Sequence, residues 1–323
     1  MSRMHGIPAV LDRNGVAVIT GGASGFGYEV ATRLLKSGMA VAILDVSAKE
    51  LREAQIRLSI IAAEAKTVIL PVLCNVTKMA DCVGARAKVD AAFPSKKISF
   101  LFNNAGIQGK AGMSILTGAS EHWKPIFEVN VFGVLNIIQA FVPKIIEDGP
   151  LPSGLKTHVV TTSSVVGLLN HNIGAYSVSK MATTAVCEQF AIELEGLGER
   201  ALHIFPHSLH PTVAATNFMM NRDSEGNAQI DASIKEMLLA KGGTSKADDI
   251  VDGLFRGLDA GDYYIIVDGK LDLPTGLQLS NRFADQITQG RPRKPEQLGA
   301  LAQFGWTADQ LKERLAKIGK SKL

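Results

Sequence analysis

The 323-residue sequence is poor in cysteine and in net charge. Its three cysteines, Cys74, Cys82 and Cys187, are odd in number and widely spaced, so we expect free thiols in a reducing compartment and no disulfide framework. The net charge is only +3, with no long block of like charge, which gives no electrostatic case for a nucleic acid or a membrane surface as a partner. The histidines are scattered without ligand spacing, and we therefore expect no metal site.

The sequence also lacks the segments that send proteins into or across membranes. Residues 1–13 have no apolar core of the kind found in a secretory signal. No uncharged apolar run reaches the roughly 20 residues that span a bilayer. The last three residues, Ser321, Lys322 and Leu323, are a peroxisomal address in a eukaryote and meaningless in a bacterium. The expected location is the cytoplasm, or the peroxisome if the source is eukaryotic.

Apolar runs typical of strands alternate with helical patterns along most of the chain. Alternation of this kind builds βαβ units, so the sequence predicts an α/β fold with a doubly wound parallel sheet, the Rossmann fold. The hydrophobic content of 46% is enough for a sizeable core. The predicted strands are 16–20, 40–44, 67–73, 98–102, 157–162, 201–209 and 263–267, and the named helices are 28–36, 48–65, 123–146 and 176–197.

We expect one Rossmann domain at residues 14–270, with an N-terminal extension at 1–13 and a C-terminal extension at 271–323. In the C-terminal extension Thr307 and Gln310 have the spacing of a capping box. An apolar stripe follows at Leu311, Leu315 and Ile318. The plain interpretation is a helix packed on the domain surface; the functional one is a cover for the active site or a subunit contact.

A glycine-rich turn, Thr20-Gly-Gly-Ala-Ser-Gly-Phe-Gly27, joins the first predicted strand to the first helix. Such a turn brings the backbone and a helix N-terminus close to a pyrophosphate. Asp45 ends the second strand, where a carboxylate accepts hydrogen bonds from the adenosine ribose of NAD and repels the 2′-phosphate of NADP. Neither Ser24 nor Val46 adds a basic group, so NAD is favoured over NADP. The alternative for Asp45 is a helix-capping acid.

Tyr176 and Lys180 are four residues apart, which places both side chains on one face of a helix. An ammonium beside a phenol lowers a pKa that starts near ~10. A tyrosine adjusted in this way can exchange a proton at neutral pH, as ketone reduction or alcohol oxidation requires. The alternative is an exposed surface pair without function.

With these residues in place, the chain resembles the short-chain dehydrogenase/reductase family over roughly residues 16–268. The glycine turn is similar to the family's Thr-Gly-x-x-x-Gly-x-Gly, with Phe26 where isoleucine is usual. Asn103-Asn-Ala-Gly106 is identical to the family's Asn-Asn-Ala-Gly motif, which implies support of the sheet beside the adenosine ribose. Asn130 is similar to the active-site asparagine that holds a proton-relay water; its alternative is a core asparagine satisfied by backbone groups.

The serine segment 161–167 offers two candidates for the catalytic serine. Ser164 directly precedes Val-Val-Gly, where the family's serine usually stands, whereas Ser163 keeps the usual thirteen-residue spacing to Tyr176. We prefer Ser164, because loops change length more readily than motifs at strand ends.

Two segments depart from the family pattern. Asn75-Val76 stands where Asp-Val is frequent near the adenine, and an asparagine can still hydrogen-bond an adenine edge. The Pro-Gly motif after the sixth strand is absent. Its best match is Pro211-Thr212, followed by Thr216-Asn217, and Pro206-His207 is a rival placement.

The resemblance implies that Asn130, Ser164, Tyr176 and Lys180 are catalytic. It also implies a set of cofactor contacts along the strand ends and the active-site helix: Thr20, Gly21, Ser24, Gly25, Phe26, Gly27, Asp45, Val46, Asn75, Val76, Asn104, Ala105, Gly106, Tyr176, Lys180, Pro211 and Thr212.

The implied activity is hydride transfer between NAD and a secondary alcohol or ketone, with Tyr176 as general acid/base. In this scheme Lys180 lowers the tyrosine pKa and binds the nicotinamide ribose, and Ser164 binds the substrate oxygen. An apolar or aromatic substrate is expected from a lid at 211–246, whose apolar residues are equally ordinary core residues: Phe218, Met219, Met220, Met237 and Leu238. An NADP-linked carbonyl reductase and a non-catalytic dinucleotide sensor or scaffold remain alternatives. The family further implies a homodimer or homotetramer.

Overall fold

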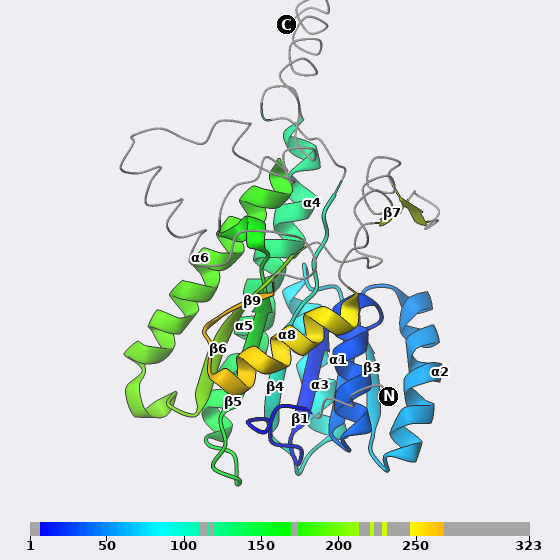
Figure 1. Ribbon diagram of the computed structural model, residues 1–323, viewed down its shortest axis with the longest axis vertical. Coiled ribbons are helices and arrows are strands. Elements are labelled where there is room, and N and C mark those ends of the chain that lie inside the picture. Colours follow the sequence, from blue (N-terminus) through cyan, green and yellow to red (C-terminus); the bar gives the residue numbers. More distant parts are fainter. Residues whose placement is uncertain are drawn as a thin grey trace, which may run out of the picture.

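The computed structural model describes residues 7–109, 115, 119–168, 174–212, 220–222, 228–230 and 246–267. Its centre is a seven-stranded sheet in the order β3-β2-β1-β4-β5-β6-β9, parallel throughout (Figure 1). The predicted doubly wound α/β fold is therefore confirmed. The strands are β1 Val16–Thr20, β2 Ala40–Asp45, β3 Ile69–Leu73, β4 Ile98–Asn103, β5 Thr157–Thr162, β6 Ile204–Pro211 and β9 Tyr264–Val267.

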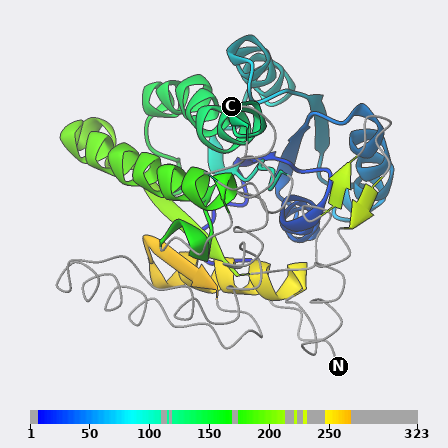
Figure 2. The ribbon, with the colours of Figure 1, turned by 90° about the horizontal axis from the view of Figure 1, so that it is seen from above.

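Helices cover both faces of the sheet. Successive strand residues point to opposite faces, so Ala17 and Ile19 of β1 enter one apolar cluster while Val16 and Val18 enter the other. The first cluster packs under α1 (Gly25–Lys36), α2 (Ala48–Glu64) and α8 (Ala247–Ala260), and the second under α3 (Met79–Ala92), α5 (Gly133–Asp148) and α6 (Ala175–Gly196). Viewed from above, the sheet lies between these two layers (Figure 2).

Most predicted elements are present with their ends shifted by one to three residues, and one predicted helix is divided. The sixth strand starts at Ile204 and not at 201, because a 3-10 turn at Gly198–Arg200 and a hydrogen bond from Ile204 N to Ala201 O occupy the preceding residues. The helix predicted at 123–146 is divided into α4 (Lys124–Phe127), a π-helical turn (Glu128–Phe132) and α5. A π turn inserts one extra residue per turn and is frequent at functional sites.

The helical run Ser120–Asp148 is long and apolar enough, by length and composition alone, to cross a membrane. Half of its most apolar window is buried inside the protein. Ile137, Phe141 and Ile145 of this run belong to the apolar cluster against the sheet. Its hydrophobicity is therefore accounted for by packing in the core.

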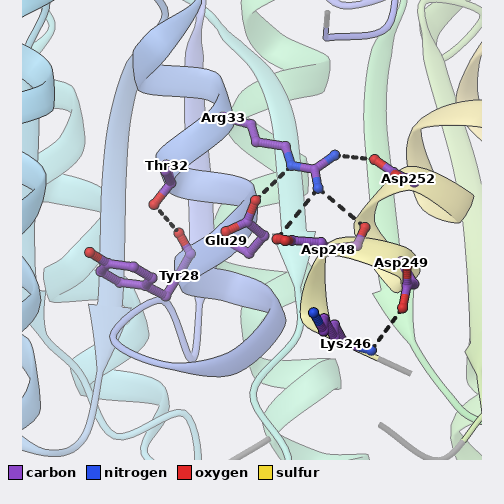
Figure 3. A network of polar contacts seen from close by, with 8 residues as sticks. All are labelled: Tyr28, Glu29, Thr32, Arg33, Lys246, Asp248, Asp249 and Asp252. Atoms are coloured by element: carbon purple, nitrogen blue, oxygen red, sulfur yellow. Dashed lines mark hydrogen bonds and ion pairs between the residues drawn. The ribbon is translucent and has the colours of Figure 1, made fainter. Parts of the chain in front are cut away.

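Arg33 of α1 connects this helix to α8 (Figure 3). Its guanidinium bonds Glu29 Oε1 at 2.7 Å, the carboxylate of Asp252 and the carbonyl oxygen of Asp248 at 3.2 Å. The Arg33 side chain is only 15% exposed, and two of its three partners belong to α8. The contact fixes the helix that leads into β9, the strand beside β6.

Several predictions fall at the ends of the chain and in the lid. Ile7 and Leu11 are buried in the core, so residues 7–13 pack on the domain. In the lid, Met220 begins the short strand β7 (Met220–Arg222), which pairs with β8 (Ala228–Ile230). The other lid residues, Thr216-Asn217, the C-terminal extension with its capping box, and Ser321-Lys322-Leu323 lie outside the described residues, and the domain boundaries stay predictions.

Candidate active site

The sequence motifs meet at one edge of the sheet. Because all seven strands are parallel, their carboxyl ends share an edge, and each motif directly follows one of them. Between β1 and β4 the strand order reverses direction, so the helices that follow these two strands lie on opposite faces. The crevice at such a point is where open α/β sheets bind their ligands.

The glycine turn after β1 has the geometry that brings a helix N-terminus to an anion. Gly21 and Gly25 have φ values of +62° and +55°, which side chains disfavour. A Cβ on Gly27 would overlap the carbonyl oxygen of Gly21, so only glycine closes the turn this tightly. Ser24 is the N-cap of α1 and its side chain makes no capping hydrogen bond, which leaves the first-turn amides available to a pyrophosphate.

Thr20 and Asn104 connect the ends of β1 and β4. The Thr20 hydroxyl accepts the amides of Asn104 at 2.9 Å and Ala105 at 3.0 Å, and Asn104 Nδ2 donates to the Thr20 carbonyl at 3.1 Å. Thr162, at the end of β5, donates to Asn104 Oδ1 at 3.2 Å. These contacts give the Asn-Asn-Ala-Gly segment a supporting role at the edge of three strands; contact of Gly106 with a ribose stays a prediction.

Asp45 joins the end of β2 to the glycine turn. Its Oδ2 accepts the amide of Ala23 at 3.2 Å, and its Oδ1 accepts the amide of Ser47 at 3.0 Å. Ser47 is itself the N-cap of α2, since its hydroxyl accepts the amide of Glu50. Each Asp45 oxygen keeps a second lone pair for another donor. The neighbouring Val46 is 65% exposed.

The segment after β3 contains Asn75, which the sequence predicts to hydrogen-bond an adenine edge, but part of its side chain is already engaged. Asn75 Oδ1 accepts both the amide and the hydroxyl of Thr77, at 3.0 and 2.9 Å, so this oxygen is engaged within its own turn. Only the Asn75 amide nitrogen is left to meet an adenine edge. Val76 is buried against Gly133, where an added Cβ would lie 2.7 Å from Val76 Cγ2.

The two candidate serines have different surroundings. Ser163 Oγ donates to the Lys180 carbonyl at 2.9 Å and lies 2.8 Å from Thr184 Oγ1. Gly167 packs so closely on it that a Cβ there would overlap the Ser163 hydroxyl. Ser164 Oγ instead makes two long contacts, to Pro211 O and Val166 N, both at 3.4 Å, and its hydroxyl bonds the Tyr176 side chain. Only Ser164 therefore faces the tyrosine.

Lys180 is buried beneath Tyr176 and is 2% exposed, so the alternative of an exposed surface pair is wrong. Its Nζ donates to the carbonyl of Thr162 at 2.7 Å and lies 5.9 Å from the centre of the Tyr176 ring. Burial lowers the pKa of Lys180 to about 8, and the nearby Cys187 thiol partly opposes this decrease.

Tyr176 has a raised pKa, which corrects the expectation that Lys180 lowers it. Loss of hydration around the half-buried phenol raises its pKa above that of a free tyrosine, and the hydrogen bond from Ser164 works in the opposite direction. The reason is geometric: the ammonium of Lys180 is directed at the Thr162 carbonyl, below the ring. In the described arrangement, Ser164 is the residue that stabilises the phenolate.

Asn130 lies in the π-helical turn between α4 and α5. Its side-chain amide pairs with both backbone groups of Ile107, accepting at 2.8 Å and donating at 2.9 Å, and also donates to Ser179 Oγ at 3.0 Å. Its carbonyl accepts the Thr183 hydroxyl at 2.8 Å. The Asn130 side-chain amide thus connects the segment after β4 to α6. These contacts agree with the alternative interpretation of Asn130, a core asparagine whose polar groups are satisfied within the protein. A water-holding role would fall to the carbonyl and stays a prediction.

The end of β6 distinguishes the two placements of the missing Pro-Gly motif. Pro206 and His207 lie inside the strand, so this rival placement is wrong. Pro211 ends the strand, and the Thr212 amide donates to Val267 O at 3.1 Å. The Thr212 hydroxyl is buried and has no hydrogen-bond partner among the described residues. A buried hydroxyl without a partner is costly, which is evidence for a ligand group at this position.

Taken together, the residues at this edge fit a dinucleotide. The open N-terminus of α1 suits the pyrophosphate, Asp45 suits a ribose diol, and the Thr212 hydroxyl offers a hydrogen bond at the other end. The part of the chain that the structure describes contains no group of three His, Cys, Asp or Glu side chains that could hold a metal.

Sequence reasoning missed three contributors to the site. Thr162 and Ile107 act through backbone groups, which any residue type provides, so no sequence signal marks them. Ser179 contributes its side-chain hydroxyl, but a serine within the helical pattern of α6 gives no sequence signal of the residue that it contacts.

Known proteins that are similar to this chain in sequence include dehydrogenases. The 1-deoxy-11-beta-hydroxypentalenate dehydrogenase of Streptomyces avermitilis is 25% identical over 267 residues, covering 82% of this chain and 88% of its own. The 2-(R)-hydroxypropyl-CoM dehydrogenase of Xanthobacter autotrophicus is 32% identical over 192 residues, covering 59% of this chain and 73% of its own.

Solved structures share the fold. A short chain dehydrogenase/reductase from Burkholderia phymatum in complex with NAD superposes with a TM-score of 0.70 at 24% identity, covering 87% of this chain and 96% of its own. A short-chain dehydrogenase from Sphingobium yanoikuyae in complex with NADPH gives 0.63 at 20% identity, covering 87% and 97%. The family model described as short chain dehydrogenase matches residues 15–226, well over half of the sequence. The chain therefore belongs to the short chain dehydrogenase family of oxidoreductases.

Proposed function

We propose that this protein is an NAD-dependent oxidoreductase that interconverts a secondary alcohol and its ketone. One observation carries the proposal: the Ser164 hydroxyl, the Tyr176 phenol and the Lys180 ammonium are assembled at the carboxyl edge of the sheet. A protein that only bound a dinucleotide would have no physical need for a buried ammonium beneath a half-buried phenol, because burying an ammonium is costly.

Each residue has a distinct task in the proposed reaction. NAD, when bound, supplies the nicotinamide that accepts the hydride from the carbinol carbon. Tyr176 takes the proton of the substrate hydroxyl during oxidation and returns it during reduction. The single hydrogen of the Ser164 hydroxyl is donated to the Tyr176 oxygen in the described arrangement and to the substrate oxygen once a substrate is bound. Lys180 holds a positive charge below the ring and binds the nicotinamide ribose.

The preference for NAD over NADP is proposed from the charge at the end of β2. Asp45 keeps lone pairs for a ribose diol, and a carboxylate here repels a 2′-phosphate. The residue that follows, Val46, is exposed and apolar and gives that phosphate no positive charge.

The substrate class is proposed from the relatives and from composition. Two relatives are named as dehydrogenases of hydroxy compounds, which supports a hydroxyl-bearing carbon as the reacting centre. Ile107, which is bonded to Asn130 and is 36% exposed, adds an apolar side chain near the site. We propose an apolar or aromatic secondary alcohol or ketone, and a homodimer or homotetramer as the working form.

The test is a titration of the purified protein with NAD and NADP separately, followed by a screen of secondary alcohols and ketones by NADH absorbance. We expect tighter binding of NAD and turnover of apolar secondary alcohols. Tyr176→Phe removes only the hydroxyl and should abolish turnover while NAD still binds. Wild-type turnover in this variant would refute the assignment, and cofactor binding without turnover of any substrate by the wild-type protein would favour a sensor.

A further inference from the structure

His210, one residue before the end of β6, is fully buried behind Ser164. Its Nδ1 lies 2.8 Å from the carbonyl oxygen of Ser164, and its Nε2 lies 2.8 Å from the hydroxyl of Ser208. Neither contact involves the Ser164 hydroxyl that faces Tyr176. The histidine thus holds the backbone of the proposed catalytic serine from behind.

The chemistry of the two partners determines where the imidazole proton lies. A carbonyl oxygen only accepts, so Nδ1 of His210 must carry the hydrogen. A neutral ring then has its lone pair on Nε2, which accepts the Ser208 hydroxyl. Burial lowers the pKa of His210 to about 4; the hydrogen bond to the Ser164 carbonyl opposes this decrease and the nearby Lys180 charge contributes to it, so the ring is neutral at pH 7.

The Ser164 carbonyl also accepts the amide of Gly167 at 2.9 Å, inside its own 3-10 turn, so His210 is the contact that connects this carbonyl to β6. Both hydrogen bonds of the Ser164 hydroxyl to the backbone are 3.4 Å long, near the limit of useful geometry. The 2.8 Å bond from His210 is much shorter. Pro211 follows His210 directly and accepts the Ser164 hydroxyl, so one strand end holds both the carbonyl and the hydroxyl of the serine.

The His210 ring is itself fixed on its other side. Its centre lies 5.8 Å from the ring of Tyr264 on β9, and the Tyr264 hydroxyl is bonded to Glu188 on α6. His210 therefore has little freedom to rotate. Its register partner on β9 is Ile266, within a regular parallel ladder.

We propose that His210 is a positioning residue, which holds the Ser164 backbone so that the serine hydroxyl faces Tyr176 and the substrate oxygen. The inference rests on the proposed function, since it assigns Ser164 a task in that reaction. His210 is then a buried residue in addition to the serine, tyrosine and lysine, and it affects turnover by fixing the position of Ser164.

The kinetic test compares three variants on an alcohol that the wild-type enzyme oxidises. His210→Leu removes the donor and should lower kcat about 10-fold, because a misplaced reacting group is costly even for small shifts. KM for NAD should stay unchanged. The pH at which kcat rises should move upward, because Ser164 lowers the Tyr176 pKa.

Two further variants separate positioning from a loss of stability. His210→Asn keeps a donor near the Nδ1 position and should restore most of the kcat. His203→Leu is the matched control: His203 is another buried histidine bonded to a backbone carbonyl, that of Ile145 at 3.1 Å, and it directly precedes the amino end of β6, at the opposite edge of the sheet from the site. It should lower stability and leave kcat and the pH profile unchanged. Equal kinetic losses in His210→Leu and His203→Leu would overturn the proposal.

A double-mutant cycle then asks whether His210 acts through Ser164. In a Ser164→Ala background, His210→Leu should cause almost no further loss of kcat, since the hydroxyl to be positioned is already gone. Two independent losses that multiply in the double variant would overturn the proposal.

A measurement without substrate separates this inference from the proposed function. Serine labelled at its carbonyl carbon, combined with 15N-valine, marks only two peptide bonds, Ser164-Val165 and Ser177-Val178, and the second is an internal reference. The Ser164 carbonyl signal should shift in His210→Leu, much less in His210→Asn, and not in His203→Leu. In the wild-type protein, 15N-histidine spectra should show the proton on Nδ1. A proton on Nε2 of His210 would overturn the proposal, and so would a Ser164 carbonyl signal that stays unchanged in His210→Leu. Both results are independent of whether any alcohol is oxidised.

Discussion

Alanine substitutions at the two neighbouring serines should have opposite effects. Ser163→Ala should lower stability and leave turnover nearly intact, whereas Ser164→Ala should abolish most turnover at little cost in stability. The difference follows from their contacts, because Ser163 is bonded inside the protein to Lys180 and Thr184 while Ser164 faces Tyr176.

The magnitudes follow from the geometry. Ser163 Oγ makes two bonds of 2.9 and 2.8 Å in a buried place, each worth about 1 kcal/mol net, so Ser163→Ala should cost about 1–2 kcal/mol. That loss lowers Tm by roughly 2–8 °C in a domain of this size. The bonds of Ser164 to the backbone are 3.4 Å long, so its removal costs less. Loss of one aligned donor to the reacting oxygen lowers kcat by about 10²–10³-fold.

The assay pairs thermal unfolding with initial rates of NADH formation on the same protein preparations. The cofactor KM is the internal check, since neither serine is expected to contact NAD. The reasoning would be refuted if Ser163→Ala lost turnover while Ser164→Ala lost stability, because the thirteen-residue spacing to Tyr176 would then identify the serine correctly and the contacts would not.

Two other outcomes follow from single residues. Asp45→Asn removes the charge that repels a 2′-phosphate and accepts the ribose hydroxyls. KM for NAD should therefore rise about 10-fold, and the discrimination against NADP should fall. An unchanged ratio of the KM values for NADP and NAD would contradict the role of this carboxylate. For Lys180, burial lowers the pKa from 10.5 to about 8, so between these pH values the unfolded chain binds more protons than the folded one. The free energy of unfolding of the wild-type protein, relative to that of Lys180→Met, should therefore rise by about 3 kcal/mol from pH 8 to 10.5. Urea titrations measure both free energies. A difference between the two proteins that stays constant or falls over this pH range would contradict the burial of the Lys180 ammonium.

Local patterns in the sequence were sufficient to predict the fold and the positions of most strand ends. The alternation of β1 side chains between the two apolar clusters and the φ values of Gly21 and Gly25 follow from residue types that physical chemistry restricts strongly. The parallel order of the strands then brings the motifs to one edge, which is why their meeting was predictable. Helix interruptions were not predictable, because the π turn at Glu128–Phe132 depends on packing against other elements.

The sequence by itself determined which residue types stand at the site, and the tertiary structure decided what each of them contacts. Spacing alone left Ser163 and Ser164 as rivals, and only the packing of Gly167 on Ser163 and the hydrogen bond from Ser164 to Tyr176 separate them. The raised pKa of Tyr176 and the contact of His210 with the Ser164 carbonyl could not be predicted from the sequence either. Burial, and the direction in which a buried donor points, arise from residues distant in the chain, so no local pattern encodes them.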